Sequence, residues 1–470
     1  MELPDKWTEL EDCLKRTMDQ HKIPGTAVAV AEKGRIVYER GFGTRDRSFG
    51  ATVDPSTIFG IASVSKSFTA LAIMILQEEG RLSVHDLVVE RLPGFRLAGT
   101  PATDVRIHHL LNHTTGLPSL RGLFSVMKES MKGYPKWDDS EQDREEEGEA
   151  PDMSTFAGHL KYLADENADL LGEPGKYFSY SNDSYAVLGA IIERVAGTSY
   201  YDFMKDRVFG AIGMGQTAFR VDDAQSLGNL SAIYLNNKQE ETLDVPRYQE
   251  CGAYDAGGGI KSTVKDLVKC GSMYAGRGVL EGERIVSAEA IKAMYEPLYQ
   301  IGRNTFYGYG LQITPGYGGM TLVEHGGSLT GVSSNFGFVP ERGVSVALLT
   351  NVGGAPSAAM WLYAMNTALG LPLEMKRSEE PHYEAGPEQL SRFVGCYKSG
   401  EGADLTIAFK DEALAIRFTG LEFPLRASDD RTLVYTVKGQ DRTARFYFGE
   451  SGQVWAVFHG LRMIRKVEQR

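Results

Sequence analysis

The sequence predicts a mixed α/β (α+β) domain followed by a small all-β barrel. One reason is a helical apolar pattern over residues 7–18 that leads into a β-hairpin turning at Lys33-Gly34. A second is a late pair of β-prone runs joined at residues 340–343, followed by a helical pattern over residues 357–370. A third is the series of short β-type runs after residue 388. Terminal strands and helices should therefore flank a largely helical middle, with the barrel after them.

The first helix and hairpin follow from local spacing. Trp7, Leu10, Leu14 and Met18 recur on one face of a helix. The stretch GTAVAVAEKGRIVYERGFG then contains two β-prone runs around Lys33-Gly34. We expect an amphipathic helix and then a hairpin.

The middle of the chain contains one polar interruption, KWDDSEQDREEEGEAPDM, at residues 136–153. It has too little apolar content to pack, which predicts an exposed loop or a disordered insertion. Its acidity favours solvation over binding. The alternative is a lid that folds over a cleft and restricts substrate entry.

The late strands lie in VSSNFGFVPERGVSVALLTNV, and SAAMWLYAMNTALG is the expected closing helix. The next stretch, KRSEEPHYEAGP, is polar and contains two prolines, which indicates a boundary. The runs LTIAF, LAIRF, FPLRA, TLVYTV, ARFYF, VWAVF and RMIRKV then predict a small antiparallel barrel or curled sheet. We therefore predict a first domain over residues 1–375, a linker over 376–387 and a barrel over 388–470.

Composition narrows the class of protein. The chain has 470 residues and a net charge of -12, which opposes nonspecific binding to phosphate backbones, and no Lys/Arg cluster with interleaved aromatics occurs. The N-terminus lacks the basic start and apolar run of a secretory signal, and no apolar run reaches the ~20 residues that a membrane-spanning helix needs. We expect no nucleic acid or membrane partner and a cytoplasmic location, while a removed leader stays open.

Neither the cysteines nor the histidines predict a metal site. The cysteines are widely scattered, without a C-x-x-C pair, and are interpreted as reduced structural thiols: Cys13, Cys251, Cys270 and Cys396. His109 and His113 have i,i+4 spacing but no H-E-x-x-H motif, so a structural role is favoured over metal ligation. No cofactor is predicted.

The stretch Ser63-Val64-Ser65-Lys66 opens a long apolar helical run and places a hydroxyl and an amine on one helix face. A serine becomes nucleophilic when a nearby base removes its proton, and a lysine serves as that base when its pKa is lowered. The same Ser-x-x-Lys spacing recurs from Ser125 and from Ser262. Ser262 is interpreted as a helix N-cap, and Ser125 lies beside the charged insertion without a second catalytic box, so Ser63 is the favoured nucleophile.

A second box, Tyr180-Ser181-Asn182, stands where a Gly/Pro-rich approach enters an amphipathic helix beginning near Asp183. Tyr180 is a candidate for proton exchange, although a basic role requires a cation such as Lys66 to stabilise its phenolate. Asn182 is a candidate hydrogen-bond partner for a substrate amide. The alternative is simple aromatic packing, since Tyr-x-Asn also occurs from Tyr234.

A third box, His325-Gly326-Gly327-Ser328, lies between two β-prone runs, where glycines such as Gly327 would let a substrate backbone approach a strand edge. The backbone N–H groups of Ser63 and Ser328 would then form an oxyanion hole. A structural histidine in a tight strand approach is the alternative interpretation of this box.

Taken in order, the three boxes resemble those of the penicillin-recognising serine hydrolases, particularly class C β-lactamases, D,D-peptidases and their esterase relatives. The resemblance runs from about residue 23 to about residue 371 and includes FGIASVSKSFTA, IHHLLNHTTGLP, YSNDSYAVLGAIIE and GGGIKSTVKDL. It implies an antiparallel sheet flanked by helices beside a helical subdomain.

The resemblance also implies roles for the boxes. Ser63 would be the acyl-accepting nucleophile, Lys66 and Tyr180 the proton-transfer pair, Asn182 a substrate-binding residue, and His325 a contributor to binding or proton movement. Class C β-lactamases typically have Lys-Thr-Gly where this chain has His-Gly-Gly, so efficient β-lactamase action is not expected. The C-terminal barrel is similar to the lipocalin-like appendage of certain peptidases of the family.

These observations predict a serine acyl hydrolase that works through a Ser63 acyl-enzyme on a small-molecule or peptide substrate. The first expectation is a peptidase or amidase, including one for peptides with D-residues. A carboxylesterase or a β-lactamase is the alternative within the family, and a noncatalytic penicillin-binding or sensor protein is the alternative of another class. Assembly into a homo-oligomer stays open.

Overall fold

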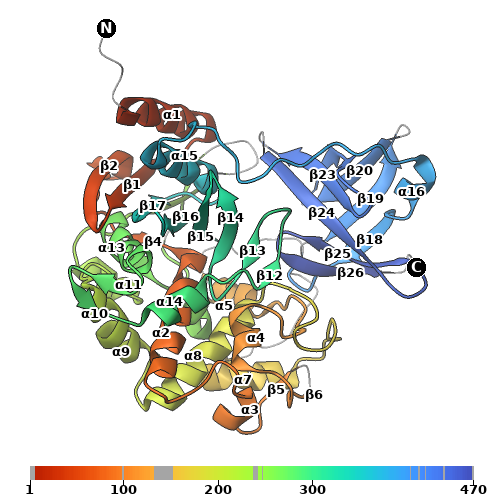
Figure 1. Ribbon diagram of the computed structural model, residues 1–470, viewed down its shortest axis with the longest axis horizontal. Helices are drawn as coiled ribbons and strands as arrows, with labels where there is room; N and C mark the ends of the chain where they lie inside the picture. The colour runs from red at the N-terminus through yellow and green to blue at the C-terminus, as the bar shows by residue number, and fades with distance from the viewer. Residues whose placement is uncertain are drawn as a thin grey trace.

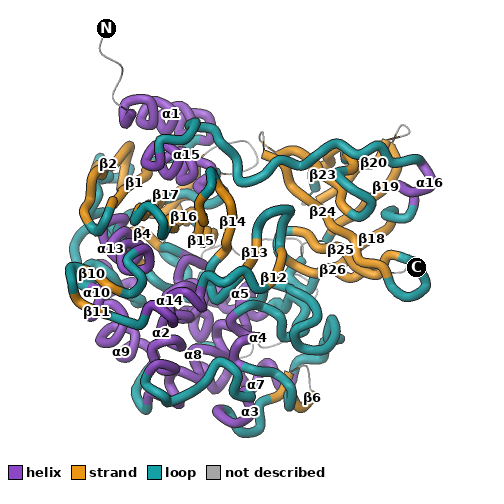
Figure 2. The backbone as a smooth tube through the Cα atoms, viewed as in Figure 1, coloured by secondary structure: helices purple, strands orange, loops and turns teal. Residues whose placement is uncertain are grey.

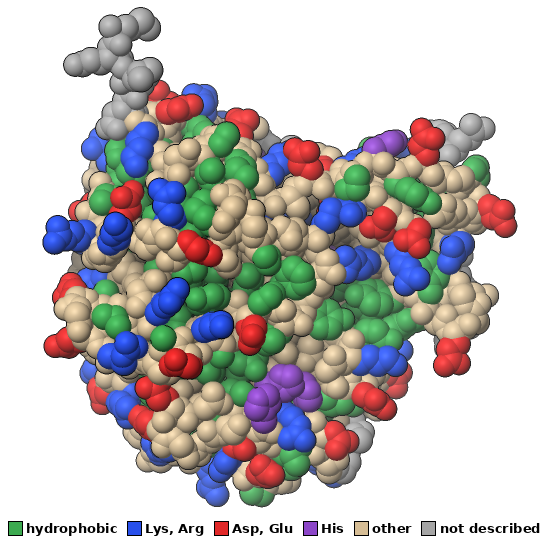
Figure 3. Space-filling view, in the orientation of Figure 1, with side chains coloured by type: hydrophobic (Ala, Val, Ile, Leu, Met, Phe, Trp, Pro, Cys, Tyr) green, Lys and Arg blue, Asp and Glu red, His purple; other side chains and the backbone are tan. Residues whose placement is uncertain are grey.

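The computed structural model describes residues 6–97, 100–131, 152–236, 242–245, 247–402, 404–410, 413–418, 420–437 and 440–467. The predicted acidic insertion lies almost wholly outside the described residues. Two sheets dominate the molecule, and Figures 1 and 2 show them in separate lobes joined by a long connection. Figure 3 shows a notch between the lobes and charges of both signs interspersed over this face.

The first lobe is built on a nine-stranded antiparallel sheet with the order β12-β13-β14-β15-β16-β17-β1-β2-β3. Its strands are β1 (Gly25–Glu32), β2 (Arg35–Asp46), β3 (Ala51–Thr52), β12 (Tyr299–Gln300), β13 (Phe306–Tyr307), β14 (Gln312–Tyr317), β15 (Met320–Leu329), β16 (Val332–Val339) and β17 (Val344–Thr350). The predicted first hairpin is confirmed, because Lys33 and Gly34 both have positive φ and join Glu32 to its partner Arg35.

The two faces of this sheet carry different helices. Along β1, alanines 27, 29 and 31 belong to the core on the helical side, whereas valines 28 and 30 pack with α1 (Lys6–His21) and α15 (Ser357–Leu369). The predicted apolar face of the first helix is confirmed, since Leu10, Leu14 and Met18 are buried in that second core. Alternation of small and branched residues therefore gives the sheet two packed faces.

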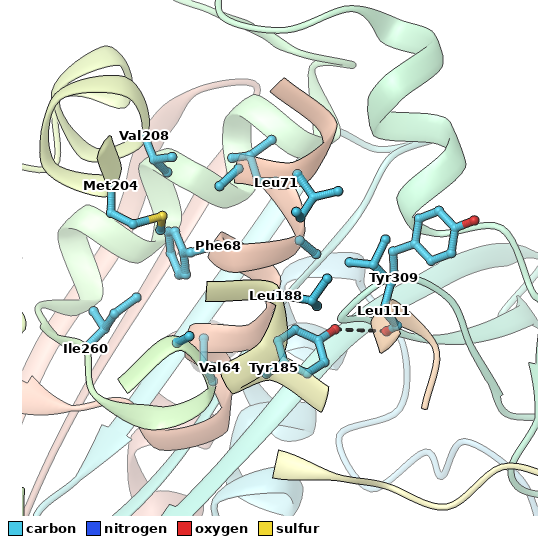
Figure 4. Packing of buried hydrophobic residues seen from close by; sticks show 14 of the residues in the cluster. Val64, Phe68, Leu71, Leu111, Tyr185, Leu188, Met204, Val208, Ile260 and Tyr309 are labelled. Atoms are coloured by element: carbon cyan, nitrogen blue, oxygen red, sulfur yellow. Dashed lines mark hydrogen bonds between the residues drawn. The ribbon is translucent and has the colours of Figure 1, made fainter. Parts of the chain in front are cut away.

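The helical side is centred on α2 (Ser65–Glu78) and α8 (Asn182–Ala196). Figure 4 shows Phe68 and Leu71 of α2 packed among residues from neighbouring elements, with the Tyr185 hydroxyl of α8 donating to the Leu111 carbonyl at 2.9 Å. Most residues of both helices are buried, as expected for helices inside a domain.

The remaining helices of this lobe are η1 (Ala62–Val64), α3 (Val88–Arg91), α4 (Ile107–Leu111), α5 (Gly122–Ser130), α7 (Phe156–Asp165), α9 (Tyr200–Phe203), η3 (Met204–Phe209), α10 (Gly210–Ile212), α11 (Val221–Ser226), η4 (Gly252–Tyr254), α12 (Asp255–Gly258), α13 (Val264–Ala275) and α14 (Ala288–Met294). Short strand pairs complete it: β4 (Phe59–Gly60) with β9 (Lys261–Ser262), β5 (Arg96–Leu97) with β6 (Thr100–Pro101), β7 (Ile233–Asn236) with β8 (Thr242–Val245), and β10 (Val279–Leu280) with β11 (Glu283–Arg284).

The structure corrects the predicted N-cap at Ser262. That residue belongs to β9 and pairs with Phe59, while the N-cap of α13 is Thr263, whose Oγ1 accepts a hydrogen bond from the Asp266 N–H at 3.1 Å. Serine and threonine are both preferred N-cap residues, with serine slightly favoured, so it is the pairing of Ser262 with Phe59 that moves the cap to Thr263.

The second lobe is a nearly closed antiparallel sheet with the order β21-β20-β19-β18-β26-β25-β24-β23-β22, which confirms the predicted barrel. Its elements are α16 (Pro387–Ser391), β18 (Gly395–Lys398), β19 (Leu405–Lys410), β20 (Ala413–Phe418), β21 (Leu421–Pro424), β22 (Arg426–Ala427), β23 (Thr432–Val437), β24 (Gln440–Phe448), β25 (Val454–His459) and β26 (Arg462–Val467). Alternate residues such as Leu405, Ile407, Leu414 and Ile416 fill its interior.

An ion pair ties the connection between the lobes to the middle of the first sheet. The Arg377 guanidinium donates to both carboxylate oxygens of Glu324 in β15, at 2.6 Å for the Nη2 bond, and Asn335 donates to the same carboxylate at 2.8 Å. The Glu324 side chain is 6% exposed. The hydrogen bonds from Arg377 and Asn335 therefore replace those that the buried Glu324 carboxylate would make with water.

Replacing Arg377 by Met is expected to destabilise the fold by about 3 kcal/mol, because Glu324 is left buried without its ion partner. Urea unfolding followed by circular dichroism measures the change. The matched control is Arg417→Met, which removes an arginine that is 67% exposed on the barrel and paired with Glu422, and which should change stability by less than about 1 kcal/mol. Equal effects of the two variants on the free energy of unfolding would contradict a stabilising role for the ion pair between Arg377 and Glu324.

Among the described residues, no helix has the length and apolar character needed to cross a bilayer. All four cysteines are free thiols, as the sequence predicts.

Candidate active site

Ser63 lies in η1, immediately before α2, and its side chain is partly exposed. The residue before it, Ala62, is buried with a φ of +47°. A left-handed alanine costs roughly 1–3 kcal/mol and persists only when its surroundings enforce it. The fold therefore keeps a strained residue next to Ser63, which lies just before the N-terminus of the buried helix α2.

Lys66 lies one turn further on and is fully buried. Its Nζ is 2.8 Å from Asn182 Oδ1, 2.8 Å from the Gly257 carbonyl and 3.3 Å from Ser63 Oγ. Burial holds the pKa of Lys66 well below its usual 10.5, and the positive charge of Arg462 lowers it further. A neutral amine has two N–H donors, which suit the two carbonyl oxygens, and one lone pair, which then faces the Ser63 hydroxyl.

Tyr180 also lies beside Ser63 and is 5% exposed. Its ring centroid is 4.8 Å from Lys66 Nζ. Burial raises the pKa of the Tyr180 phenol, and a hydrogen bond with Ser63 opposes that shift only in part. The phenolate that a basic Tyr180 would need is therefore disfavoured, whereas burial shifts Lys66 towards its neutral form.

The Tyr-Ser-Asn box works as a helix entry. Ser181 is the N-cap of α8, and its Oγ accepts from the Ser184 N–H at 3.1 Å. Asn182 is consequently the first helical residue, one position before the predicted start, and its amide oxygen reaches Lys66. The alternative Tyr-x-Asn from Tyr234 lies in β7.

The third box lies on β15, against the nucleophile. A Cβ at Gly327 would lie 3.0 Å from the Ser63 backbone nitrogen and 2.3 Å from the Ile61 carbonyl oxygen, so only glycine fits there. The pairing of β14 with β15 ends at Glu324, whereas the pairing of β15 with β16 continues to Leu329. The stretch that includes Gly327 and the exposed Ser328 thus presents a strand edge beside Ser63.

His325 is buried and belongs to a hydrogen-bonded chain. Its Nε2 lies 3.0 Å from the Tyr307 hydroxyl, which lies 3.1 Å from His113 Nε2, and His325 Nδ1 lies 2.6 Å from the Gly326 carbonyl. His113 Nδ1 accepts from the Ser181 N–H at 3.1 Å. The chain then has one consistent direction: His113 Nε2–H donates to Tyr307, Tyr307 donates to His325 Nε2, and His325 Nδ1–H donates to the carbonyl.

His113 and His325, the two histidines of this hydrogen-bonded chain, are both neutral. Burial lowers the pKa of His325 to about 3 and that of His113 well below its usual range. His325 therefore does not act as a permanent cation or as a proton carrier near neutral pH. Its geometry supports a role in holding β15 beside Ser63.

Sequence reasoning gave Tyr307 no role, and it favoured a structural role for His113 without linking it to the site. His109 and His113 have different surroundings: His109 Nδ1 accepts from the Arg106 N–H at the start of α4. The phrase IHHLLNHTTGLP was the signal available for His113. Within the described ranges, no group of three or more potential metal ligands is close enough to hold an ion.

The free energy of unfolding is expected to fall as the pH drops from 6.5 towards 4. In the folded chain burial lowers the pKa of His109 and of His459 to about 4, of His325 to about 3 and of His113 well below 6.5. In the unfolded chain these groups gain protons below about 6.5, so the unfolded state binds more protons and stability falls by up to about 1.4 kcal/mol per pH unit for each histidine. Urea titrations at several pH values measure the slope, and constant stability between pH 6.5 and 5 would contradict it.

The other Ser-x-x-Lys pairs do not join this arrangement. Ser125 lies partly exposed on α5 and donates to the Arg121 carbonyl, and Ser262 is bonded to Thr217 across the β9 region. Two residues of the barrel, Arg462 and Glu401, do reach it. Arg462 lies over the Tyr180 ring, with Cζ 4.7 Å from the ring centroid, and sequence reasoning gave neither residue a role.

Comparisons with known proteins agree with this geometry. The family model described as Beta-lactamase matches residues 10–369, a range that contains all three boxes. Penicillin-binding protein 4 of Amycolatopsis lactamdurans is 28% identical over 414 residues, which cover 84% of this chain and 98% of the relative. The solved structure of an octameric penicillin-binding protein homologue from Pyrococcus abyssi has a TM-score of 0.70 and 29% identity, covering 98% of this chain and 99% of that chain.

A D-stereospecific amidohydrolase from Streptomyces sp. shares the fold, with a TM-score of 0.61 and 22% identity over 77% of this chain and 98% of that chain. The family match extends over the first sheet and the helical region, where Ser63 meets Lys66 and the edge of β15. This chain therefore belongs to the beta-lactamase family of serine hydrolases.

Proposed function

We propose that the protein hydrolyses amide bonds of small peptides through an acyl-enzyme on Ser63. The observation that carries this proposal is the contact of 3.3 Å between Ser63 Oγ and the buried Nζ of Lys66, whose other two contacts are both with carbonyl oxygens. A lysine whose pKa is lowered by burial, and whose Nζ lies within hydrogen-bond distance of the hydroxyl, is suited to take the Ser63 proton.

In the first step the Ser63 Oγ–H proton passes to Lys66 Nζ while Oγ forms a bond to the substrate carbonyl carbon. The electron pair of the carbonyl π bond moves to its oxygen. We assign the stabilisation of that oxyanion to the backbone N–H groups of Ser63 and Ser328; the close approach of Gly327 to the Ser63 nitrogen supports this. Asn182, held by Lys66, is positioned to bond the substrate's amide.

Expulsion of an amine requires that its nitrogen receive a proton. Tyr180 suits this step, because its neutral phenol is bonded to Ser63 and can pass its proton to the leaving nitrogen while the proton on Lys66 replaces it. Water then attacks the acyl-enzyme by the same route in reverse. Such a donor makes amides accessible as substrates, whereas activated esters need less leaving-group protonation.

The name of the Amycolatopsis relative refers to penicillin, whose lactam is an amide, which supports an amide carbonyl as the electrophile. Initial rates on matched D- and L-aminoacyl anilides, a short-chain aryl ester and a chromogenic cephalosporin test the proposal, with the acylated Ser63 peptide identified by mass spectrometry. Anilide turnover is expected, and the D/L ratio gives the stereochemical preference. Ester-only turnover would establish a carboxylesterase, and stoichiometric acylation without turnover a penicillin-binding or sensor protein.

We include a homo-oligomer in the proposal, supported by the octameric Pyrococcus abyssi homologue and its coverage of both lobes of this chain. Light scattering of the purified protein measures the mass in solution.

A further inference from the structure

A turn of the C-terminal barrel is docked directly on the active site. Gly460 and Leu461 join β25 to β26, and both have positive φ, at +54° and +66°. Glycine adopts such angles without strain, but leucine does so at a cost of about 1 kcal/mol or more. The Leu461 carbonyl accepts from the Tyr180 N–H at 2.8 Å, and the Met463 N–H donates to Ser179 Oγ at 3.3 Å.

Aromatic contacts fix this docking on the residues that precede Tyr180. Tyr177 packs against Trp455 with ring centroids 5.3 Å apart, and Phe178 meets Phe458 edge to face at 5.9 Å. These rings belong to one buried cluster shared by both lobes. The turn is therefore held in place by a buried interface and forms a permanent wall of the site.

Arg462 is the first residue of β26 after this turn. Its Cζ lies 4.7 Å from the centre of the Tyr180 ring, and its Nε donates to Glu401 at 3.0 Å. The side chains of Arg462 and Glu401 are 19% and 10% exposed. Glu401 thus holds the Nε edge of the guanidinium, and the Gly460 carbonyl accepts from Nη1 at 3.3 Å. These two bonds fix the direction of the guanidinium beside Tyr180, while Nη1 keeps its second N–H for a ligand.

We propose that Arg462 is a specificity-determining residue that binds a substrate carboxylate on the leaving-group side of the scissile bond. The inference rests on the proposed function, in which Tyr180 marks the leaving-group side because it protonates the departing nitrogen. A planar guanidinium over the ring of that tyrosine is within reach of a carboxylate one residue beyond the scissile bond. Arginine binds carboxylates through two parallel N–H bonds, which gives both affinity and orientation.

The box His325-Gly326-Gly327-Ser328 supplies no positive charge for a substrate carboxylate, which leaves this task to Arg462. His325 is neutral and engaged with Tyr307, so β15 contributes no positive charge at its box. The barrel then supplies the charge from outside the family-matched range, which ends at residue 369. The substrate class is an acyl donor whose leaving group ends in a free carboxylate, such as a peptide with one residue after the cleaved bond.

The test compares two N-acylglycyl thioesters, one with mercaptoacetate and one with mercaptoacetamide as the leaving group. They differ only in carboxylate against carboxamide. In the wild-type protein kcat/KM is expected to favour the carboxylate, and Arg462→Gln is expected to reduce the carboxylate-to-amide ratio by about 10- to 100-fold. The ratio is unaffected by any change in the amount of folded protein or in the strength of the base.

Arg417→Gln is the matched control, because it removes a barrel arginine that is also bonded to a glutamate, Glu422, but is exposed on β20. It should leave the ratio at the wild-type value. If Arg462→Gln fails to fold, Arg462→Lys keeps the charge, loses the fork and should still lower the ratio. Wild-type rates equal on both thioesters, or an Arg462→Gln ratio equal to wild type, would overturn the carboxylate subsite while leaving the Ser63 hydrolase intact. No acylation of Ser63 by either thioester would overturn both.

Discussion

Replacing Ser63 by Ala is expected to lower turnover of every substrate by about 10⁵-fold or more and to abolish covalent acylation. Lys66 would keep its bonds to Asn182 and Gly257, so the variant should fold. It would lack the Ser63 hydroxyl, which is the proposed nucleophile. Intact-mass measurement after incubation with the thioester or the cephalosporin shows whether an acyl group is added. Initial rates on the aryl ester measure the residual turnover.

Ser125→Ala is the matched control, since Ser125 heads the same Ser-x-x-Lys spacing on α5 and is also partly exposed. Its rates and its acyl adduct should equal those of the wild type. If Ser63→Ala were still acylated at full stoichiometry, the nucleophile would have to be another residue, and the assignment of Ser63 would be wrong. The comparison separates the chemistry of the site from the mere presence of the spacing.

The elements predicted correctly are those whose signals are local. The hairpin at Lys33-Gly34, the helix over residues 357–369 and the barrel strands each depend on side-chain spacing within one short stretch. The N-cap of α13 was misplaced by one residue because Ser262 and Thr263 are both good caps, and the choice is made by the pairing of Ser262 with Phe59.

In the candidate site too, features with a local sequence signal were predicted and features that depend on tertiary contacts were not. Ser63 with Lys66, and Tyr180 with Asn182, are pairs within three residues of each other, so a sequence pattern can reveal them. His113 and Tyr307 are 194 residues apart and Tyr180 meets Leu461 across the two lobes, so these contacts depend on tertiary structure. No spacing along the chain encodes them.

Protonation states were also beyond the sequence. From residue types alone, a basic Tyr180 beside a charged Lys66 was an acceptable hypothesis. Burial reverses it, because it lowers the pKa of the amine and raises that of the phenol. The complete enclosure of Lys66, which decides the question, arises from the packing of α2 against α8 and α12.

Replacing Lys66 by Met is expected to lower kcat/KM by about 10³-fold near neutral pH, which is the usual contribution of a general base. Methionine nearly matches the length of the lysine stem and tolerates a buried position, but it has no lone pair able to accept the Ser63 proton. Wild-type activity should fall as the pH drops through the lowered pKa of Lys66, because a protonated amine cannot accept a proton. The pH profile of Lys66→Met should lack that limb.

Lys128→Met is the control for removal of a lysine from the other Ser-x-x-Lys pair on α5 and should keep both the rate and the profile. The Lys66→Met rate and pH profile show which member of the proton-transfer pair, Lys66 or Tyr180, removes the Ser63 proton. A Lys66→Met enzyme with wild-type rate and an unchanged acidic limb would mean that Tyr180 removes the Ser63 proton by itself. The raised pKa of the Tyr180 phenol argues against that outcome, because a phenol that stays protonated across the working pH range has no capacity to act as the first base.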